Sequence, residues 1–189
     1  GVSWHNKIIV IDNRFISERV NQIRNWNMEF IHGDILDKDL VNKYFKDADV
    51  VHHLAGVTDV PRTKNESSKD QDEKIKIVGE EGTQNILDII PDSCKIVFPS
   101  THVVYEGINE VKTNIKEDET TKPVLSYSSS KAFNENQLKN SGKNYIILRL
   151  GSVYGYSSDS MRIDIMPNLF SKIASQNGTL KLFAGGRQI

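Results

Sequence analysis

The chain has 189 residues, of which 38% are hydrophobic, enough for one domain with a buried core or for one domain and part of another. Its 24 basic and 25 acidic residues give a formal net charge of -1, so no global field recruits nucleic acid or an anionic membrane. The apolar runs are far shorter than the ~20 residues that a bilayer span needs, and no basic segment followed by an apolar one opens the sequence. We therefore expect a soluble, cytoplasmic protein that binds neither nucleic acid nor membranes.

The sequence offers few ways to build a disulfide or a metal site. Cys94 is the single cysteine, so neither an internal disulfide nor a thiolate zinc site can form. His52 and His53 are neighbours in an expected strand, where adjacent side chains point to opposite faces and cannot share a metal. We therefore expect a reducing compartment and no bound metal.

Short β-branched runs alternate along the chain with longer segments that carry apolar residues at three- and four-residue spacing. Such alternation is typical of βαβ units, in which helices cover both faces of a parallel sheet. The pattern therefore predicts an α/β protein with a doubly wound parallel sheet. In chain order, the expected elements are strand 7–12, strand 28–32, helix 37–45, strand 50–54, a solvated loop or helix start at 62–73, helix 74–90, strand 95–98, helix 126–139 and strand 145–150.

The pattern becomes less regular after Gly155. There the residue spacing predicts a helix around Met166–Ala174 and a strand around Thr179–Phe183. A turn-forming glycine pair, Gly185-Gly186, stands almost at the end of the sequence and suggests an element interrupted by truncation. The resulting division is 1–155 for a first domain and 156–189 for the start of a second.

Tyr127 and Lys131 lie four residues apart on an expected helix, so both side chains project from the same face. A free phenol has a pKa near ~10, too high for proton transfer at neutral pH, but a neighbouring ammonium favours the phenolate and lowers that pKa. The spacing therefore permits a tyrosine acid or base. A solvated helix face explains the same pair of residues equally well.

Polar side chains also stand where two expected strands end. Ser100 and Thr101 follow a strand at its carboxyl end, where ligands bind in open α/β sheets, and a hydroxyl there can hydrogen-bond a substrate alcohol that Tyr127 deprotonates. Asp12 ends the first expected strand, where a carboxylate typically accepts the ribose hydroxyls of an adenine dinucleotide and repels a 2'-phosphate. The alternative is a strand-ending turn at Asp12-Asn13.

Taken together in this order, these residues resemble the extended short-chain dehydrogenase/reductase family, specifically its nucleotide-sugar epimerase and dehydratase branch. The resemblance runs over essentially the whole chain, and the joint order of the motifs makes it specific. It implies a Rossmann-like fold with the beginning of a small substrate domain. The matching segments are Val10–Asn13, Gly33–Ile35, His53–Gly56, Gly82-Thr83, Phe98–Tyr105, Pro123, Ser126-Tyr127, Ser130-Lys131 and Arg149–Gly155.

The resemblance implies NAD as the cofactor and a nucleotide-sugar as the substrate. In this assignment Tyr127 removes a sugar hydroxyl proton, Lys131 lowers the tyrosine pKa and holds the nicotinamide ribose, and Thr101 hydrogen-bonds the reacting oxygen. The implied cofactor contacts are Asp12, Asn13, Asp34, Ile35, Leu54, Ala55, Gly56, Ser100, Tyr127 and Lys131. The implied substrate contacts are Thr58, His102, Ser152, Asn168 and Phe183.

The sequence departs from the family pattern in ways that bear on the fold and the site. The strand and glycine-rich turn that open the family, and that hold the dinucleotide pyrophosphate, are missing from this sequence. In the strand order 3-2-1-4-5-6 that first strand is central, so its absence predicts two half-sheets with unpaired inner edges. In addition, Gly79 stands where the family usually has asparagine, and Ser152 where many members have one near the sugar-nucleotide phosphates.

The resemblance favours epimerisation over dehydration. A dehydratase of this family places an aspartate and a glutamate directly after the catalytic threonine as additional acid and base, whereas this chain has His102 and Val103. Valine has no transferable proton, and His102 is either one acid or base or a packed residue. We therefore expect an NAD-dependent nucleotide-sugar epimerase that passes through a keto-sugar. The alternatives are a dehydratase or reductase of the same family, or a noncatalytic dinucleotide-binding sensor or scaffold.

The helices expected at 74–90 and 126–139 resemble those that form a four-helix dimer interface in this family. The resemblance therefore implies a homodimer. The alternative is that their charged outer faces are simply solvated.

Overall fold

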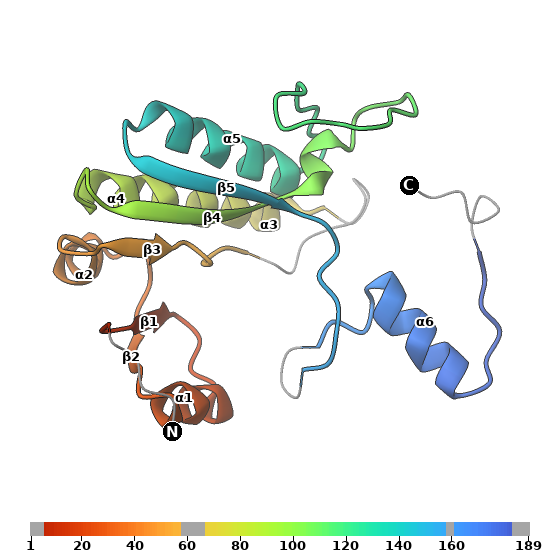
Figure 1. The fold of residues 1–189 in the computed structure, drawn as a ribbon, viewed down its shortest axis with the longest axis horizontal. Helices are drawn as coiled ribbons and strands as arrows, with labels where there is room; N and C mark the ends of the chain where they lie inside the picture. Colours follow the sequence, from red (N-terminus) through yellow and green to blue (C-terminus); the bar gives the residue numbers. More distant parts are fainter. Residues whose placement is uncertain (1–5, 58–66, 158–160, 183–189) are drawn as a thin grey trace. The chain divides into compact units, whose positions relative to one another are not determined.

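The structure, a computed structural model, describes residues 6–57, 67–157 and 161–182. The chain divides into two compact units, one of residues 1–151 and the other of residues 152–189. All described strands belong to the first unit, and the second contains the helix α6. Figure 1 shows these elements in chain order.

The first unit begins with a two-stranded parallel sheet. In it, β1 (Ile9–Asp12) pairs with β2 (Glu29–His32), and helix α1 (Ser17–Asn25) connects the two strands. The strands agree with the sequence prediction, but the helix was not predicted. Only Val20 and Ile23 are buried in α1, so few apolar positions mark its inner face in the sequence.

A second, three-stranded parallel sheet follows, with the strand order β3-β4-β5. It consists of β3 (Val50–His52), β4 (Lys95–Thr101) and β5 (Asn144–Leu150). Strand β4 extends beyond the predicted end at Phe98, because its last residues continue to pair with the end of β5. The extension places Thr101 at the final ladder position of the strand.

Helices pack on this sheet through apolar side chains. Ile86, Ile96, Phe98 and Leu138 are fully buried in one core that joins α4, β4 and α5, and Figure 1 shows α5 running alongside β4 and β5. The helical segments are α2 (Lys38–Phe45), α3 (Lys69–Lys76), a π-helical turn (Ile77–Glu81), α4 (Gly82–Ile89) and α5 (Ser126–Asn140). The spacing of apolar residues predicted α2, α4 and α5. Helix α3 begins inside the stretch 62–73, predicted as a solvated loop or helix start, and the π-helical turn interrupts the single helix predicted over 74–90.

The sheet is split between β1 and β3. Among the described residues, β1 pairs only with β2, and β3 pairs only with β4. This confirms the two half-sheets predicted from the missing first strand. The two groups of strands are instead linked through side chains, because Ile35 and Val41, which follow β2, belong to the same core cluster as Ile86.

The second unit contains the predicted helix near its centre. Helix α6 (Met166–Ser175) begins with Pro167 in its first turn, where the missing amide hydrogen of proline costs no hydrogen bond. The strand predicted at Thr179–Phe183 is wrong over residues 179–182, which form no ladder with any described strand. Phe183 itself lies outside the described residues. No helix in the described ranges is both long and apolar enough to cross a membrane.

Gly79, in the π-helical turn, lets α5 approach the neighbouring helical segment closely. A Cβ atom at Gly79 would overlap the Ser130 hydroxyl oxygen of α5, whereas the Ser130 Cβ is 3.7 Å away. The Gly79 carbonyl also accepts hydrogen bonds from Thr83 Oγ1 at 2.6 Å and from Asn134 Nδ2 at 3.0 Å. Glycine at this position therefore serves the packing of the two helices.

We expect Gly79→Ala to destabilise the fold, because the new methyl group meets the Ser130 hydroxyl. The double variant Gly79→Ala/Ser130→Ala should recover the loss, since the remaining Ser130 Cβ is at an ordinary contact distance of 3.7 Å. The free energy of unfolding, measured with urea for the wild type, both single variants and the double variant, checks this pairing. Simple additivity of the two single substitutions would contradict it.

Candidate active site

Two of the predicted catalytic residues, Tyr127 and Lys131, lie at the start of α5, next to the strand β4 that ends in Thr101. Lys131 Nζ donates a hydrogen bond to the Pro99 carbonyl of β4 at 2.9 Å and lies 4.4 Å from the centre of the Phe98 ring. The same nitrogen is 5.9 Å from the centre of the Tyr127 ring, one turn earlier on α5. The structure therefore brings Tyr127, Lys131 and the strand that ends in Thr101 together.

Burial changes the ionisation of Lys131. Its surroundings lower the pKa of the ammonium from 10.5 to about 8, because burial disfavours the charged form. The carbonyl of Pro99 and the face of the Phe98 ring are the neighbours that compensate for the lost water. A lysine in this state is charged at neutral pH but releases its proton more readily than an exposed lysine.

Thr101 ends β4 and caps the turn that follows it. Its hydroxyl oxygen accepts a hydrogen bond from the Val103 amide at 3.3 Å, at the start of the 3-10 turn His102–Tyr105. This contact uses a lone pair of the oxygen and leaves the hydroxyl proton available as a donor. The side chain is mostly buried. Thr101 therefore combines a fixed oxygen with a donor function at the edge of the sheet.

Ser100 points in another direction from Thr101. Its hydroxyl donates to Glu135 Oε1 of α5 at 2.6 Å, and the residue is buried. Since neighbouring residues of a strand face opposite sides, Ser100 lies on the helix side of the sheet. Ser100 is a predicted cofactor contact, but in the structure its hydroxyl pairs with the buried carboxylate of Glu135.

The residues predicted to bind the adenosine half of the cofactor gather at the ends of β1 and β2. Asn13 Nδ2 donates to Asp34 Oδ2 at 2.9 Å, and the Arg14 amide donates to Asp12 Oδ1 at 2.8 Å. His32 Nε2 is 3.0 Å from the Asn13 carbonyl and must be the donor there, because a carbonyl only accepts. Two carboxylates and an amide at adjacent strand ends match the hydroxyl groups of a ribose.

Ile35 is placed differently from its neighbours. Its side chain is buried in the core. It packs so closely on Gly82 that any residue with a Cβ atom at position 82 would overlap it. Its carbonyl accepts a hydrogen bond from Asn85 Nδ2 at 3.1 Å. Ile35 thus anchors the segment after β2 to α4.

The segment after β3 is open. Leu54 is 71% exposed, Ala55 is partly buried, and a Cβ atom at Gly56 would meet nothing within 4 Å. These three residues were predicted to pass beside the cofactor. Their exposure leaves the backbone at the end of β3 accessible.

His53, next to this segment, is a buried residue of the matching segment His53–Gly56 that is not among the predicted site residues. Its Nε2 lies 2.9 Å from Thr83 Oγ1, whose own proton goes to the Gly79 carbonyl, so His53 Nε2 must carry the hydrogen. Burial, reinforced by the charge of Lys131, lowers the pKa of His53 to about 3. The ring is therefore neutral, and its buried Nδ1 atom has no hydrogen-bond partner among the described residues.

The predicted substrate residues fall into three groups. His102 is exposed, and its Nδ1 lies 3.1 Å from the Leu150 carbonyl, so Nδ1 donates and Nε2 is the unprotonated nitrogen of the neutral ring. Ser152 and Asn168 belong to the second unit, where Asn168 Oδ1 accepts from the Gly155 amide at 3.1 Å. Thr58 and Phe183 lie outside the described residues.

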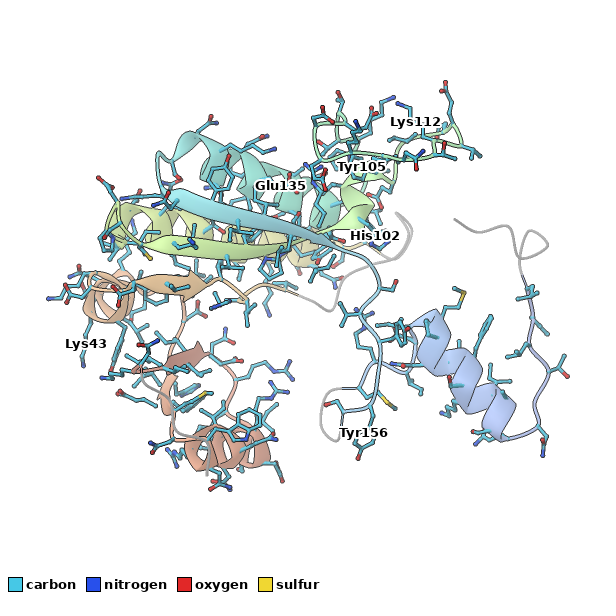
Figure 2. All side chains as sticks on the ribbon, in the orientation of Figure 1. Lys43, His102, Tyr105, Lys112, Glu135 and Tyr156 are labelled. Atoms are coloured by element: carbon cyan, nitrogen blue, oxygen red, sulfur yellow. The ribbon has the colours of Figure 1, made fainter. Side chains whose placement is uncertain are left out.

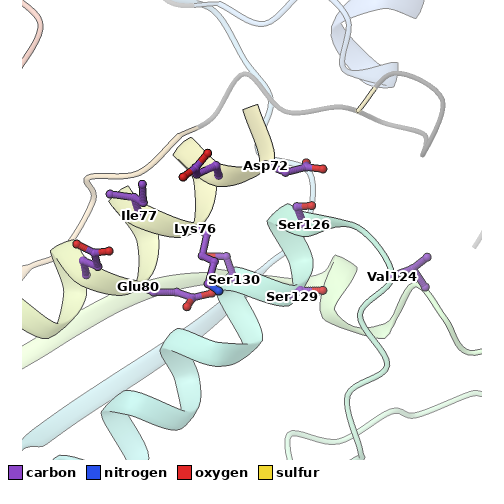
Figure 3. Close-up of a pocket in the computed structure, with 10 residues that line it drawn as sticks. Asp72, Lys76, Ile77, Glu80, Val124, Ser126, Ser129 and Ser130 are labelled. Atoms are coloured by element: carbon purple, nitrogen blue, oxygen red, sulfur yellow. The ribbon is translucent and has the colours of Figure 1, made fainter. Parts of the chain in front are cut away.

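An open groove of about 690 Å³ lies between α3, the π-helical turn and the first turns of α5 (Figure 3). Its lining includes Asp72, Glu80, Ser126 and Ser130, and burial raises the pKa of Glu80. Neither the predicted catalytic residues nor the predicted cofactor residues line it. We therefore place the candidate active site at the end of β4 and not in this groove. Within the described ranges, no group of three or more histidine, cysteine, aspartate or glutamate side chains could hold a metal ion.

Comparison with known proteins identifies the family of the chain. Residues 3–189 match the NAD dependent epimerase/dehydratase family, and the chain belongs to that family. The family is NAD-dependent and consists of enzymes of the extended short-chain dehydrogenase/reductase class.

The chain is 33% identical over 102 residues to the CDP-paratose 2-epimerase of Salmonella typhi, covering 50% of this chain and 28% of that protein. It is 28% identical over 147 residues to a 3beta-hydroxysteroid-dehydrogenase/decarboxylase of Arabidopsis thaliana, covering 70% of this chain and 24% of that protein. The chain thus spans about a quarter of the length of these curated relatives.

Among solved structures, the UDP-glucuronic acid 4-epimerase of Bacillus cereus, in complex with UDP-glucuronic acid and NAD, is similar with a TM-score of 0.72 and 27% identity. The match covers 96% of this chain and 59% of that one. The UDP-glucose 4-epimerase of Thermotoga maritima has a TM-score of 0.73 at 22% identity, with the same coverage, and shows a shared fold.

We expect Lys131→Met to change how stability depends on pH. The folded wild type releases the Lys131 proton near pH 8 and the unfolded chain only near 10.5, so the unfolded state binds more protons between these values. Wild-type stability should therefore rise relative to the variant by about 2.5 kcal/mol between pH 7 and pH 10. Urea unfolding of the full-length protein without cofactor measures this difference.

A matched control is Lys74→Met, which removes an exposed ammonium from α3. Its stability should run parallel to that of the wild type across the same pH range. If Lys131→Met also runs parallel, the ammonium is not desolvated in the folded state.

Proposed function

We propose that the full-length protein is an NAD-dependent nucleotide-sugar epimerase that acts by transient oxidation to a keto-sugar. The observation that carries this proposal is the position of Lys131, bound to the strand that ends in Thr101 and one turn from Tyr127. Membership of the epimerase/dehydratase family supports it, as does the similarity to the Bacillus cereus UDP-glucuronic acid 4-epimerase in complex with UDP-glucuronic acid and NAD.

The residues present suit both ends of an NAD molecule. Asp12, Asn13 and Asp34 offer acceptors and a donor for the adenosine ribose, and Lys131 offers a donor for the nicotinamide ribose. When bound, NAD accepts a hydride from the sugar and returns it. The Asp12 carboxylate favours NAD over a cofactor with a 2'-phosphate, since the two negative charges would repel each other.

Proton transfer is the task of the side chains. In the proposed mechanism Tyr127 takes the proton of the reacting sugar hydroxyl and later gives it back, which a phenol can do once a nearby ammonium stabilises its anion. Lys131 supplies that ammonium. The Thr101 hydroxyl donates to the same sugar oxygen and orients it. If the hydride were returned to the opposite face of the keto-sugar, the carbon centre would be inverted.

Incubation of the full-length protein with NAD and UDP-, GDP-, CDP- and dTDP-sugars tests this function by NMR of the products. We expect a single-centre epimer. Tyr127→Phe should lower kcat by roughly 100- to 10,000-fold, because it removes the acid and base, and should leave NAD affinity nearly unchanged. A 4-keto-6-deoxy product would instead assign a dehydratase.

His102 is the proposed acidic or basic contact to the substrate. Its Nδ1 is held by the Leu150 carbonyl, which leaves Nε2 on the exposed side of the ring, next to Thr101 in sequence. We propose that Thr58, Ser152, Asn168 and Phe183 complete the substrate contacts, by resemblance to the family.

We expect His102→Asn to lower kcat/KM by roughly 100-fold or more, because the variant loses the ring nitrogen proposed to exchange a proton with the substrate. Asparagine can keep the donor to the Leu150 carbonyl, so the local fold should be retained. Steady-state kinetics of the wild type and the variant, with NAD affinity as a control, provide the measurement. Equal kcat/KM values would mean that His102 exchanges no proton with the substrate.

A further inference from the structure

Glu135 is a buried carboxylate on the same face of α5 as the catalytic pair. It follows Lys131 by four residues and Tyr127 by eight, so the three side chains form one stripe along the helix. Its exposure is only 1%, which is unusual for a glutamate. Charged side chains this deeply buried need partners.

The partners of Glu135 come from the two strands beneath α5. Ser100 Oγ of β4 donates to Oε1 at 2.6 Å, Arg149 Nε of β5 donates to Oε1 at 2.9 Å, and Arg149 Nη2 donates to Oε2 at 2.6 Å. Lys139, which is 44% exposed, adds a weaker contact at 3.6 Å. Burial alone would raise the pKa of Glu135, but the hydrogen bonds and charge of Arg149 and the bond from Ser100 outweigh it, and the pKa is lowered.

Arg149 extends the same network to the segment that follows β4. Its Nη1 donates to the Tyr105 hydroxyl and, at 2.9 Å, to the Glu117 carbonyl. The Tyr105 hydroxyl in turn donates to the Lys116 carbonyl at 3.1 Å. Figure 2 shows Glu135 on α5 and Tyr105 near the end of β4. One guanidinium therefore connects the buried carboxylate, β5 and the loop between β4 and α5.

The members of this network each stand close to a proposed reactive group. Ser100 is the neighbour of Thr101, and Glu135 is one helical turn from Lys131. Ser100 and Arg149 are also paired across β4 and β5 in the ladder. A paired carboxylate and guanidinium fix direction as well as distance, because two parallel hydrogen bonds allow little rotation.

We propose that Glu135 and Arg149 are positioning residues that hold the catalytic helix in register with the end of β4. Through Ser100 and Arg149 the carboxylate sets the separation between Thr101 on the strand and Tyr127 and Lys131 on the helix. Stability alone does not require such a pair, since buried ion pairs can often be replaced by apolar residues of similar volume without loss. This inference rests on the proposed function only for its kinetic consequence.

The test uses the full-length protein and the double variant Glu135→Leu/Arg149→Met, which replaces the pair by apolar side chains. We expect its stability in urea to stay near that of the wild type. We also expect kcat to fall roughly 10- to 100-fold with KM changed less than about twofold, because misplaced groups slow the chemical step. In its crystal structure the contact between Lys131 Nζ and the Pro99 carbonyl, 2.9 Å in the wild type, should be lost.

Two further variants separate positioning from folding. Lys139→Met removes the weak, half-exposed partner and should keep wild-type kcat. Glu135→Gln keeps the shape of the side chain and can still accept from Ser100, so it should retain more kcat than Glu135→Ala at equal stability. If the double variant unfolds, this comparison decides between positioning and mere packing.

A stable double variant with wild-type kcat would overturn the inference and leave the proposed epimerase intact. If the wild type turns over no nucleotide-sugar, the proposed function fails. The crystal structure of the double variant then tests the positioning role without kinetics. An unchanged contact between Lys131 and Pro99 in the double variant would then refute positioning.

Discussion

The close contact between α5 and β4 is the constraint on which the candidate site depends. Phe98 of β4 and Leu138 of α5 are fully buried in the shared core, and Lys131 reaches across to the Pro99 carbonyl. Apolar burial supplies the attraction between helix and strand but sets no direction. The hydrogen bonds of Lys131 and Glu135 at the same interface are directional. They can therefore fix the position of α5 along β4.

This constraint explains which parts of the structure the sequence could predict. The strands β3, β4 and β5 and the helices α2, α4 and α5 carry regular apolar spacing, because each must bury one face. For this reason the sequence predicts them. Helix α1 buries only Val20 and Ile23, too few positions to produce a periodic signal. The strand predicted at Thr179–Phe183 is absent over residues 179–182 although its apolar pattern is present. A strand also needs a neighbouring strand to pair with, and no described strand pairs with these residues.

The same distinction holds within the site. That Tyr127 and Lys131 lie near each other could be predicted, because a four-residue spacing on one helix is a local property of the sequence. Their catalytic roles are implied by the resemblance to the family and not by the spacing. Glu135 continues that spacing, but from the sequence alone a glutamate on a helix is expected to be solvated. The structure shows that Ser100 and Arg149 bind its carboxylate. Those partners are 35 and 14 residues away in sequence. Contacts that depend on strand order become visible only when the fold is known.

Because the sheet is split, the packing around Ile35 helps to connect its two parts. The residues suited to adenosine lie at the ends of β1 and β2, whereas the proposed catalytic residues lie on β4 and α5, and no described strand pairs the two groups. Their relative position therefore depends on side chains: Ile35 against Gly82, and the Asn85 amide on the Ile35 carbonyl at 3.1 Å. A cofactor that binds both groups of residues would itself link the two sheets. Since a ligand that binds only the folded arrangement stabilises it, cofactor binding and the ordering of the two half-sheets should be thermodynamically coupled.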